Sequence, residues 1–400
     1  LNSYKNLEEE VFIIGGAQIY KQALNSCDKL YITLIHESFE ADTYFPEIDE
    51  NRFKEADSLG ILESKKNSLK YEFKVYEKKV MKLASLFAGI GGIDLGFEQA
   101  GFNPVWANEI DVPASETFRL NHSNVELIVE DICKIDAIQI PNVDVLAGGF
   151  PCQAFSVAGY RKGFDDDRGN LFFQIIRLLS KMEEQQRLPK VVFLENVKNL
   201  HSHDNGNTFK VIKTELEKLG YHLGAEVLNS MEYGNVPQNR ERIYIVAFLD
   251  RNALKRFKWP EKMELSNTLG KVICRSEQVD KKYYYSNDKK TYSLLKENIK
   301  NKTSVYQFRR VYVRENKSGV SPTLTANMGM GGHNVPLILD NNNDIRKFTP
   351  RECLNLQGFP KDFKIPKDLP DSQIYKQAGN SVTVPVIKSI AEAIKKAVSE

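Results

Sequence analysis

The 400-residue chain is predicted to be mainly an α/β protein, with a doubly wound, mostly parallel sheet and a smaller inserted domain. After Met81, strand-like apolar runs alternate with helix-like segments, which is typical of parallel strands joined by helices on both faces of a sheet. One segment, 250–345, interrupts this alternation with polar, lysine-rich and tyrosine-rich sequence. The composition, 42% hydrophobic and 27% charged, is ordinary for a globular protein of two or three packed units.

The first predicted elements lie in residues 1–80, which form a separate block. The run at 11–24, VFIIGGAQIYKQAL, predicts a buried strand, a glycine turn and a helix, and strand-like runs follow at 29–36 and 71–79. With Gly15, Gly16 and the motif ADTYFPEID at 41–49, the block resembles the C-terminal part of a dihydrofolate reductase over residues 1–79. The resemblance implies that the half of the enzyme with the folate-binding carboxylate is missing, so we expect no reductase activity.

A fragment of this kind leaves strand edges unpaired and a core incomplete. We therefore expect residues 1–80 to be a poorly ordered or parasitic segment and not a working domain. The chain starts at Leu1, and Met81 opens a new strand. We expect the functional protein to begin at Met81 and the preceding residues to come from an upstream reading frame or a gene fusion.

From Met81 the predicted elements follow in a regular order. Strands are expected at 81–89, 103–110, 143–149, 191–197 and 242–248, and helices at 92–101 and 112–122 follow the first two strands. Helical periodicity returns at 348–360 and 377–398. These boundaries give an α/β part at 81–249, an inserted domain at 250–345 and a C-terminal return at 346–400 that completes the α/β domain. Sheets of this class bind ligands at the carboxyl ends of their strands.

Charge is distributed unevenly along the chain. The whole chain carries +2, whereas residues 251–339 hold 18 Lys and Arg against 7 Asp and Glu, or +11, which leaves −9 for the rest. A basic segment within an otherwise acidic protein is typical of a surface that binds a polyanion such as DNA, and a merely solvated surface is the alternative.

Composition also excludes some classes of protein. No run approaches the ~18 consecutive apolar residues of a membrane span, and residues 1–10 lack the pattern of a secretory signal. We therefore expect a cytoplasmic protein with no membrane partner. The five cysteines are odd in number, widely spaced and free of C-x-x-C pairs, so neither a disulfide framework nor a zinc site is indicated. We expect no bound metal and a monomeric protein.

The predicted strand ends carry residues suited to a nucleoside cofactor. The motif FAGIGG at 87–92 follows the first strand, and its glycines allow the backbone to turn sharply and to approach a ligand. Glu109 ends the second strand, where a carboxylate accepts hydrogen bonds from ribose hydroxyls, and Asp131 ends a third at a position suited to an adenine amino group. The glycine spacing is not the G-x-G-x-x-G of dinucleotide sites, which favours S-adenosylmethionine over a nicotinamide cofactor. A structural turn and surface carboxylates are the alternative for each feature taken singly.

Four motifs together resemble the DNA (cytosine-5-)-methyltransferase family. They are GGFPCQAFS at 148–156, LENV at 194–197, QNRERIYIVA at 238–247 and QAGNSVTVPV at 377–386, in family order and at compatible spacing. The resemblance covers residues 81–400, most loosely at 250–320. It implies the fold of S-adenosylmethionine-dependent methyltransferases, with a catalytic and cofactor-binding domain at 81–249, a DNA target recognition domain at 250–345 and the C-terminal return at 346–400.

The resemblance also implies a reaction, in which a thiolate adds to C6 of a flipped-out cytosine and pushes electron density onto C5 for methylation. Cys152 matches the nucleophile, and Glu195 matches the group that hydrogen-bonds or protonates N3. Arg240 and Arg242 match residues that orient Glu195 or bind the flipped nucleotide. The expected cofactor-binding residues are Phe87, Gly89, Ile90, Gly91, Gly92, Glu109, Ile110, Asp131, Ile132, Pro151, Asn380 and Ser381.

DNA contacts are expected in two places. The polar, glycine-bearing stretch 153–169 is expected to close over the DNA, and the recognition domain is expected to read guanine edges with arginines and to place the glycine-rich segment 321–334 in a groove. The expected contact residues are Gln153, Ser156, Arg161, Lys162, Arg168, Arg309, Arg310 and Arg314.

The expected partner is therefore double-stranded DNA with a short specific sequence, in a restriction-modification system whose cognate endonuclease is encoded nearby. Two alternatives are a tRNA cytosine-C5 methyltransferase and a catalytically silent DNA-binding relative. Against the first, the Cys-Phe-Thr segment of such relatives is absent; against the second, the four catalytic positions are intact. Ser85 and Glu130 depart from the family pattern, where aspartate and glycine are common, and this leaves open only the details of cofactor affinity.

Overall fold

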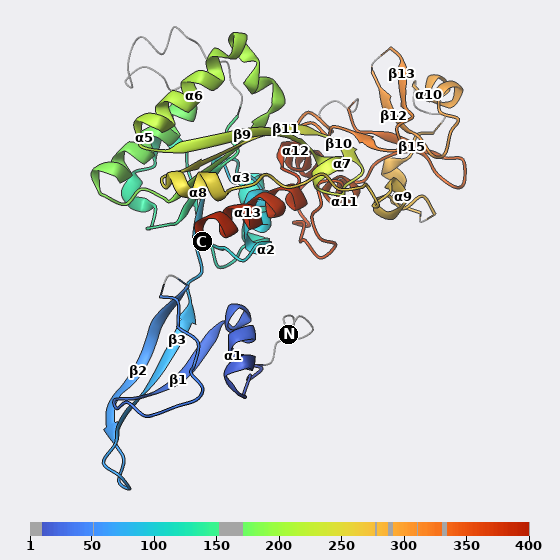
Figure 1. Cartoon of the computed structure of the whole chain (residues 1–400). Helices are drawn as coiled ribbons and strands as arrows, with labels where there is room; N and C mark the ends of the chain where they lie inside the picture. Colours follow the sequence, from blue (N-terminus) through green and yellow to red (C-terminus); the bar gives the residue numbers. More distant parts are fainter. Residues whose placement is uncertain are drawn as a thin grey trace. The chain divides into compact units, whose positions relative to one another are not determined.

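The computed structural model describes residues 10–50, 52–151, 171–276, 278–286, 291–309, 311–329 and 334–399. The chain divides into two compact units, one up to Val80 and one from Met81 to Val398, and each is described by itself (Figure 1). Within the described residues, no helix has both the length and the apolar character needed to cross a membrane.

The first unit is a three-stranded antiparallel sheet with one short helix. Its elements are α1 (Ala17–Ala23), the 3-10 helix η2 (Leu24–Ser26), β1 (Lys29–Ile35), β2 (Phe53–Glu63) and β3 (Lys70–Lys78), with the strand order β1-β3-β2. The strand predicted at 11–14 is wrong, because this segment pairs with none of the described strands and its side chains Phe12 and Ile14 are 62% and 86% exposed. An apolar run forms a buried strand only where a neighbouring strand and a core are available to it.

The second unit is built on a seven-stranded sheet with the order β6-β5-β4-β7-β8-β11-β9. The first five strands in this order are parallel, whereas β11 and β9 are antiparallel to their neighbours. The bounds are β4 (Lys82–Leu86), β5 (Asn103–Glu109), β6 (Glu126–Val129), β7 (Val145–Gly148), β8 (Val191–Val197), β9 (His222–Asn229) and β11 (Glu241–Phe248). The mostly parallel sheet predicted from the sequence is therefore present.

Helices cover both faces of this sheet, as expected for a doubly wound fold (Figure 1). Alternate residues of a strand face opposite sides, so Val192 and Leu194 pack with α5 (Leu171–Glu184) and α6 (Asn207–Lys218), while Val191 and Phe193 pack with α2 (Gly92–Gln99) and α13 (Val384–Ser399). The remaining helices of this part are α3 (Val112–Asn121), α7 (Ser230–Tyr233), α8 (Arg251–Arg256), and the 3-10 turns η3 (Ile132–Lys134), η4 (Ala137–Gln139), η5 (Lys198–His201) and η6 (His203–Gly206).

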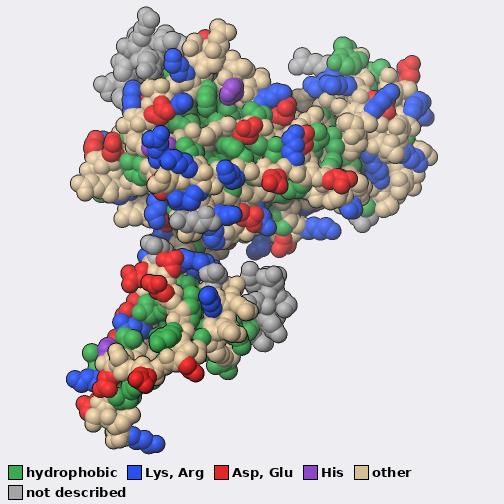
Figure 2. Space-filling view, viewed as in Figure 1, with side chains coloured by type: hydrophobic (Ala, Val, Ile, Leu, Met, Phe, Trp, Pro, Cys, Tyr) green, Lys and Arg blue, Asp and Glu red, His purple; other side chains and the backbone are tan. Residues whose placement is uncertain are grey.

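The inserted region has a small sheet and a core of its own. The sheet has the order β13-β12-β15-β16, and its apolar residues Tyr306 and Leu337 pack with Leu295 and Ile299. Figure 2 shows Lys and Arg side chains spread over this region on the face in view. Its elements are α9 (Leu269–Val272), η7 (Lys281–Tyr283), α10 (Tyr292–Asn298), β12 (Val305–Phe308), β13 (Val313–Asn316), β14 (Ser321–Pro322), β15 (Leu337–Leu339) and β16 (Ile345–Lys347).

The chain then returns to the α/β part through α11 (Pro350–Asn355), α12 (Asp371–Asn380) and α13. The short strand β10 (Gln238–Asn239) pairs in parallel with β14, which joins the inserted region to the main sheet just before β11 begins. The segment 321–334 is therefore not a free loop at its start, since Leu324 and Met328 are buried.

Candidate active site

A cavity of about 890 Å³ lies at the carboxyl ends of the parallel strands. Residues that directly follow β4, β5, β6 and β7 line it with the last residues of β8, together with residues at the start of β11, in the segment after β14 and at the end of α12. Parallel strands present their carboxyl ends at one edge of the sheet, which explains why residues so far apart in sequence meet here.

The turn after β4 brings backbone close to the cavity. Phe87 and Gly89 have positive φ angles of 54° and 59°, and both line the cavity. Gly92 is required for packing, because a Cβ atom there would lie 2.7 Å from Oγ of Ser381. Gly91 has a φ of 85° and is the N-cap of α2, but it is not among the cavity-lining residues. A Cβ atom at Gly91 would lie 2.2 Å from Nε2 of His122, so the side chain of His122 packs directly against this turn.

Glu109 is the last residue of β5, and Asp131 lies just after β6. Both residues line the cavity. Oε1 of Glu109 accepts hydrogen bonds from the backbone N–H groups of Ile110 and Asp111, at 2.9 and 2.7 Å, and Oε2 accepts one from Gly89 at 2.7 Å. Among the described residues, Oε2 thus keeps a free acceptor position. Oδ1 of Asp131 accepts from the backbone of Cys133 at 2.9 Å, and this bond holds the pKa of Asp131 below its ordinary value.

The other predicted cofactor residues divide between buried and exposed positions. Ile90 and Ile132 are buried and line the cavity, whereas Ile110 lines it with a side chain that is 62% exposed. Pro151, Asn380 and Ser381 also line the cavity: Pro151 lies in the segment after β7, Asn380 ends α12, and Ser381 follows it.

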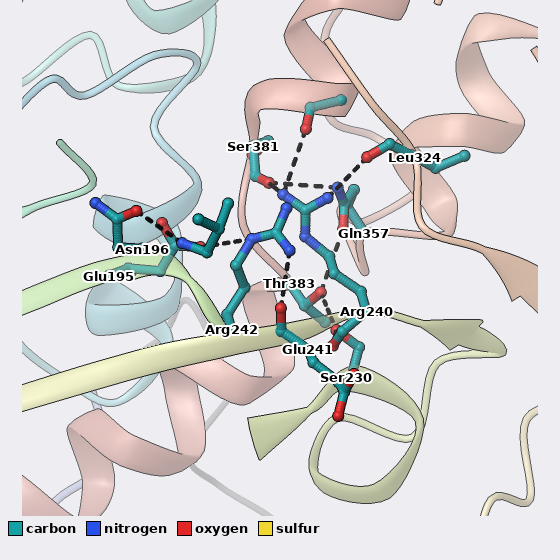
Figure 3. A network of polar contacts seen from close by, with 12 residues as sticks. Glu195, Asn196, Ser230, Arg240, Glu241, Arg242, Leu324, Gln357, Ser381 and Thr383 are labelled. Atoms are coloured by element: carbon teal, nitrogen blue, oxygen red, sulfur yellow. Dashed lines mark hydrogen bonds and ion pairs between the residues drawn. The ribbon is translucent and has the colours of Figure 1, made fainter. Parts of the chain in front are cut away.

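Glu195, near the end of β8, is buried beside Arg242 of β11 (Figure 3). The distance from Nε of Arg242 to Oε1 of Glu195 is 3.1 Å. Burial raises the pKa of Glu195 above its ordinary value, although the charges of Arg242 and Arg240 act in the opposite direction. A carboxyl group in this environment keeps its proton to higher pH than an exposed one, which suits a group that must donate a hydrogen bond.

Arg240 lies between β10 and β11 and is 2% exposed. Its guanidinium group donates to backbone carbonyl groups and not to Glu195: Nη1 to Leu324 at 2.9 Å, and Nη2 to Ser381 at 2.6 Å and Gly379 at 3.3 Å (Figure 3). Burial lowers the pKa of Arg240 to about 9. Of the two predicted arginines, Arg242 is thus the one that the structure pairs with Glu195.

Cys152, Gln153, Ser156, Arg161, Lys162, Arg168 and Arg310 lie outside the described residues. The residues just before the cysteine are described, and they belong to the cavity wall: Phe150 and Pro151 both line it. Asn196 holds this turn, because its Nδ2 donates to the carbonyl oxygen of Phe150 at 2.8 Å. Sequence reasoning missed Asn196, although its place inside the LENV motif was a signal for it.

A second, polar recess of about 370 Å³ lies between the inserted sheet and the β10–β14 pair. The predicted DNA-contact residues Arg309 and Arg314 line it, with Gln307 and Asn316 on the same two strands or their ends. Nη2 of Arg309 donates to Oε1 of Gln307 at 3.1 Å, so these two side chains are in contact in the recess. Thr325 lines both this recess and the larger cavity.

An ion pair between two residues that line the larger cavity was also not predicted. Lys376 of α12 forms an ion pair with Asp111, the N-cap residue of α3, and both residues line the cavity. One residue further on, Gln377 accepts a hydrogen bond from Thr117 and donates one to the carbonyl group of Pro113. The described residues contain no group of three side chains that could hold a metal ion.

Comparison with known proteins decides the family. The family model for C-5 cytosine-specific DNA methylases matches residues 81–396. The chain belongs to this family. The Type II methyltransferase M.Bsp6I of Bacillus sp. (strain RFL6) is 54% identical over 320 residues, which cover 79% of this chain and 99% of that protein. M.HhaI of Haemophilus parahaemolyticus is 37% identical over 326 residues, which cover 78% and 93%.

Solved structures of methylases share the fold. The Entamoeba histolytica methyltransferase EhMeth has a TM-score of 0.62 at 21% identity, over 80% of this chain and 100% of that one. The S. pombe Dnmt2 methyltransferase has a TM-score of 0.60 at 19% identity, over 80% and 99%. The predicted methyltransferase fold and the predicted cytosine C5 DNA methylase activity are confirmed. Residues 1–78 match the family model of dihydrofolate reductase, so the second predicted resemblance is confirmed as well.

Proposed function

We propose that the methylase uses Cys152 as its nucleophile and Glu195 as the hydrogen-bonding acid, with S-adenosylmethionine as the methyl donor and a short duplex DNA sequence as the target. The observation that carries the proposal is the buried Glu195–Arg242 pair, which lines the same cavity as Pro151. Pro151 directly precedes Cys152 in the sequence. A thiolate and an acid are the two groups that addition to C6 of cytosine requires.

The cavity fits S-adenosylmethionine by the nature of its polar groups. The free acceptor position on Oε2 of Glu109 suits a ribose hydroxyl, and the second oxygen of Asp131 suits an adenine amino group. A Cβ atom at Gly89 would meet none of the described residues within 4 Å, so the backbone there is open to a ligand. When bound, S-adenosylmethionine supplies the methyl group that C5 receives.

Glu195 and Arg242 act on the cytosine ring in this proposal. As Cys152 adds to C6, negative charge moves onto the ring and N3 takes a hydrogen bond or a proton from Glu195. Arg242 fixes Oε1 of Glu195 by its 3.1 Å contact and so orients the other carboxyl oxygen. After methylation, loss of the C5 proton and expulsion of the Cys152 thiolate complete the reaction.

The recess that Arg309 and Arg314 line is the proposed site where bases of the target sequence are read. Arginine donates two parallel hydrogen bonds to guanine, and amide side chains such as Gln307 and Asn316 recognise adenine in the same manner. The +11 charge of residues 251–339 supports attraction to phosphates. Arg161, Lys162, Arg168 and Arg310 remain proposed phosphate or base contacts from the sequence alone.

Membership of a restriction-modification system, with a cognate endonuclease, is also part of the proposal, as are a cytoplasmic location and a monomeric state.

Expression of the chain in a host without cytosine methylation, followed by bisulfite sequencing of host DNA and tRNA, tests the proposal. The wild type is expected to protect cytosines in one short DNA motif, and Cys152→Ser to protect none. Cys274 is a half-buried cysteine of the inserted region, and Cys274→Ser is the matched control. This variant should protect the same cytosines as the wild type. Equal protection by Cys152→Ser would reject the nucleophile, and protection of tRNA alone would reject the DNA target.

Cofactor binding has a separate test. Glu109→Gln is expected to weaken binding of S-adenosylhomocysteine by roughly 10-fold or more, because a hydrogen bond to a charged group contributes about 1.5–3 kcal/mol. Isothermal titration calorimetry of the purified protein measures this without any need for activity. Unchanged affinity would show that Glu109 does not contact the ligand.

A further inference from the structure

Three segments that are far apart in sequence meet at the guanidinium group of Arg240. The first is Arg240 itself, between β10 and β11; the second is Leu324, just after β14 of the inserted region; the third is the end of α12, at Gly379 and Ser381. Figure 3 shows the guanidinium group between Leu324 and Ser381. Since Arg240 is buried, these bonds replace solvent as its source of acceptors.

A second, independent observation joins the same two segments. A Cβ atom at Gly379 would lie 2.1 Å from the carbonyl oxygen of Thr325 and 2.6 Å from the nitrogen of Ala326. The backbone of the inserted region therefore rests directly on α12, and only glycine permits this approach. Thr325, Ala326, Gly379 and Ser381 all line the larger cavity, so this contact forms part of its wall.

Buried amide side chains complete the contact. Oε1 of Gln238 accepts from the backbone of Leu324 at 3.0 Å, and its Nε2 donates to the carbonyl group of Leu356 at 2.8 Å. Nε2 of Gln357 donates to the carbonyl group of Ala378 at 2.8 Å. A buried polar network of this kind permits few alternative arrangements, because any shift leaves polar groups without partners.

Thr325 lies in the wall of both the polar recess and the larger cavity. The recess is also lined by the residues just before it, Ser321, Pro322 and Thr323. One short stretch of backbone is thus shared by the proposed base-reading site and the wall of the proposed cofactor site. A duplex that fixes this stretch of backbone also fixes the part of the larger cavity that α12 forms, because Arg240 and Gly379 connect the two.

We propose that Arg240 is a positioning residue that couples the two sites, so that duplex DNA and S-adenosylmethionine each strengthen binding of the other. The inference rests on the proposed function for the identity of the two ligands. Coupling between two binding sites is reciprocal, and typical values change affinity about 5- to 150-fold. Arg240 acts through the backbone carbonyl groups that it holds, whereas Glu195 is held by Arg242.

The test measures binding of S-adenosylhomocysteine to the full chain by calorimetry, with and without a duplex that contains the target sequence. In the wild type the duplex is expected to tighten binding by ~5-fold or more. In Arg240→Met the factor by which the duplex tightens binding should fall below about 2-fold. Arg240→Lys keeps the charge but not the forked donors, so its factor should lie between those of the wild type and Arg240→Met. Arg119→Met, the same change at an exposed arginine of α3 that lies outside residues 251–339, should keep the wild-type factor.

Two results would overturn the inference: a wild type whose affinity does not respond to the duplex, or an Arg240→Met variant with the full factor. If Arg240→Met does not fold, Arg240→Lys decides, and an unchanged factor in that variant rejects the coupling. Failure of the proposed function is seen separately, as absence of protected cytosines in the wild type. Loss of stability alone would lower the melting temperature of a variant and leave its coupling factor unchanged.

Discussion

Glu195 shows how a local environment prepares a carboxyl group for catalysis. Its side chain is buried, its pKa is raised by that burial, and Arg242 restricts its orientation. Asp94, on α2, is buried more completely than Glu195. Its Oδ1 accepts a hydrogen bond from Oγ of Ser85 at 2.6 Å, and its Oδ2 has no hydrogen-bond partner among the described residues. Burial raises the pKa of Asp94 to about 7. The two carboxyl groups lead to different expectations, one for activity and one for stability.

The variant Glu195→Gln is expected to lower the rate of methyl transfer by roughly 10²–10⁴-fold, because the amide still donates a hydrogen bond to N3 but cannot transfer a proton. In the wild type the rate should fall as pH rises through the raised pKa of Glu195, since the protonated form is the active one, and this fall should be absent in the variant. Single-turnover transfer of labelled methyl groups at several pH values measures both effects.

Glu241→Gln is the matched control for that experiment. Glu241 is the neighbour of Arg242 and pairs with Lys198 at a half-exposed position outside the cavity. A similar loss of rate in both variants would mean that the charge of the region matters and not the carboxyl group at position 195.

Asp94→Asn is expected to change how stability depends on pH. The pKa of Asp94 rises from 3.8 to about 7 on folding, so the free energy of unfolding of the wild type should fall as pH increases between these values and stay low above pH 7. The variant lacks this fall and should gain stability relative to the wild type from pH 4 to pH 8. Urea unfolding followed by tryptophan fluorescence reports on this part alone, since Trp106 and Trp259 both follow Met81. Parallel profiles for the two proteins would contradict the assignment.

At the scale of elements, close approach of backbone decides how the helices pack on the sheet. Gly96 of α2 faces α13, and a Cβ atom there would lie 2.6 Å from Cβ of Ile387 and 3.1 Å from the backbone nitrogen of Lys388. Gly270 of α9 offers the contrast, because a Cβ atom there would lie no closer than 3.9 Å to its nearest neighbour among the described residues, Oγ1 of Thr268.

Gly96→Ala is therefore expected to lower the free energy of unfolding by about 1–3 kcal/mol, as overpacking of a close helix contact does. The same substitution at Gly270 should raise it by up to about 1 kcal/mol, because alanine is the better helix former. Urea unfolding by tryptophan fluorescence compares the two. Equal effects would indicate that helix propensity, and not the contact with α13, governs both sites.

After Met81, the strands that the sequence predicted with bounds are those that are buried along most of their length. The strand Val191–Val197 is buried on both faces, and the sequence predicted it. The sequence did not predict β9, in which apolar and polar residues alternate only weakly and which contains Gly224. The strand at 11–14 was predicted from apolar residues alone, and no described strand pairs with it. The partners of Arg240 were beyond prediction, because Leu324 and Ser381 are 84 and 141 residues away and are contacted through backbone atoms that carry no sequence signal.

At the scale of the whole molecule, apolar side chains are used differently in the two units. All five hydrophobic clusters of the described residues are built from residues that follow Val80. Of the 23 large hydrophobic side chains that the described chain exposes, 15 lie in the first unit. Burial of apolar surface is the main source of folding free energy, so the second unit has the means to fold without the first.

A protein that starts at Met81 is therefore expected to keep the methylase activity and stability of the full chain. Its rate of DNA methylation should agree within about 2-fold and its urea midpoint, followed at Trp106 and Trp259, should be unchanged, because the described hydrophobic clusters and the lining of the two cavities of the second unit all lie after Val80. It should also aggregate less at high concentration, as exposed apolar patches promote association. Methyl transfer to the target duplex, urea unfolding and light scattering measure the three properties. A lower midpoint in the shortened protein would show that the first unit contributes to the stability of the methylase fold.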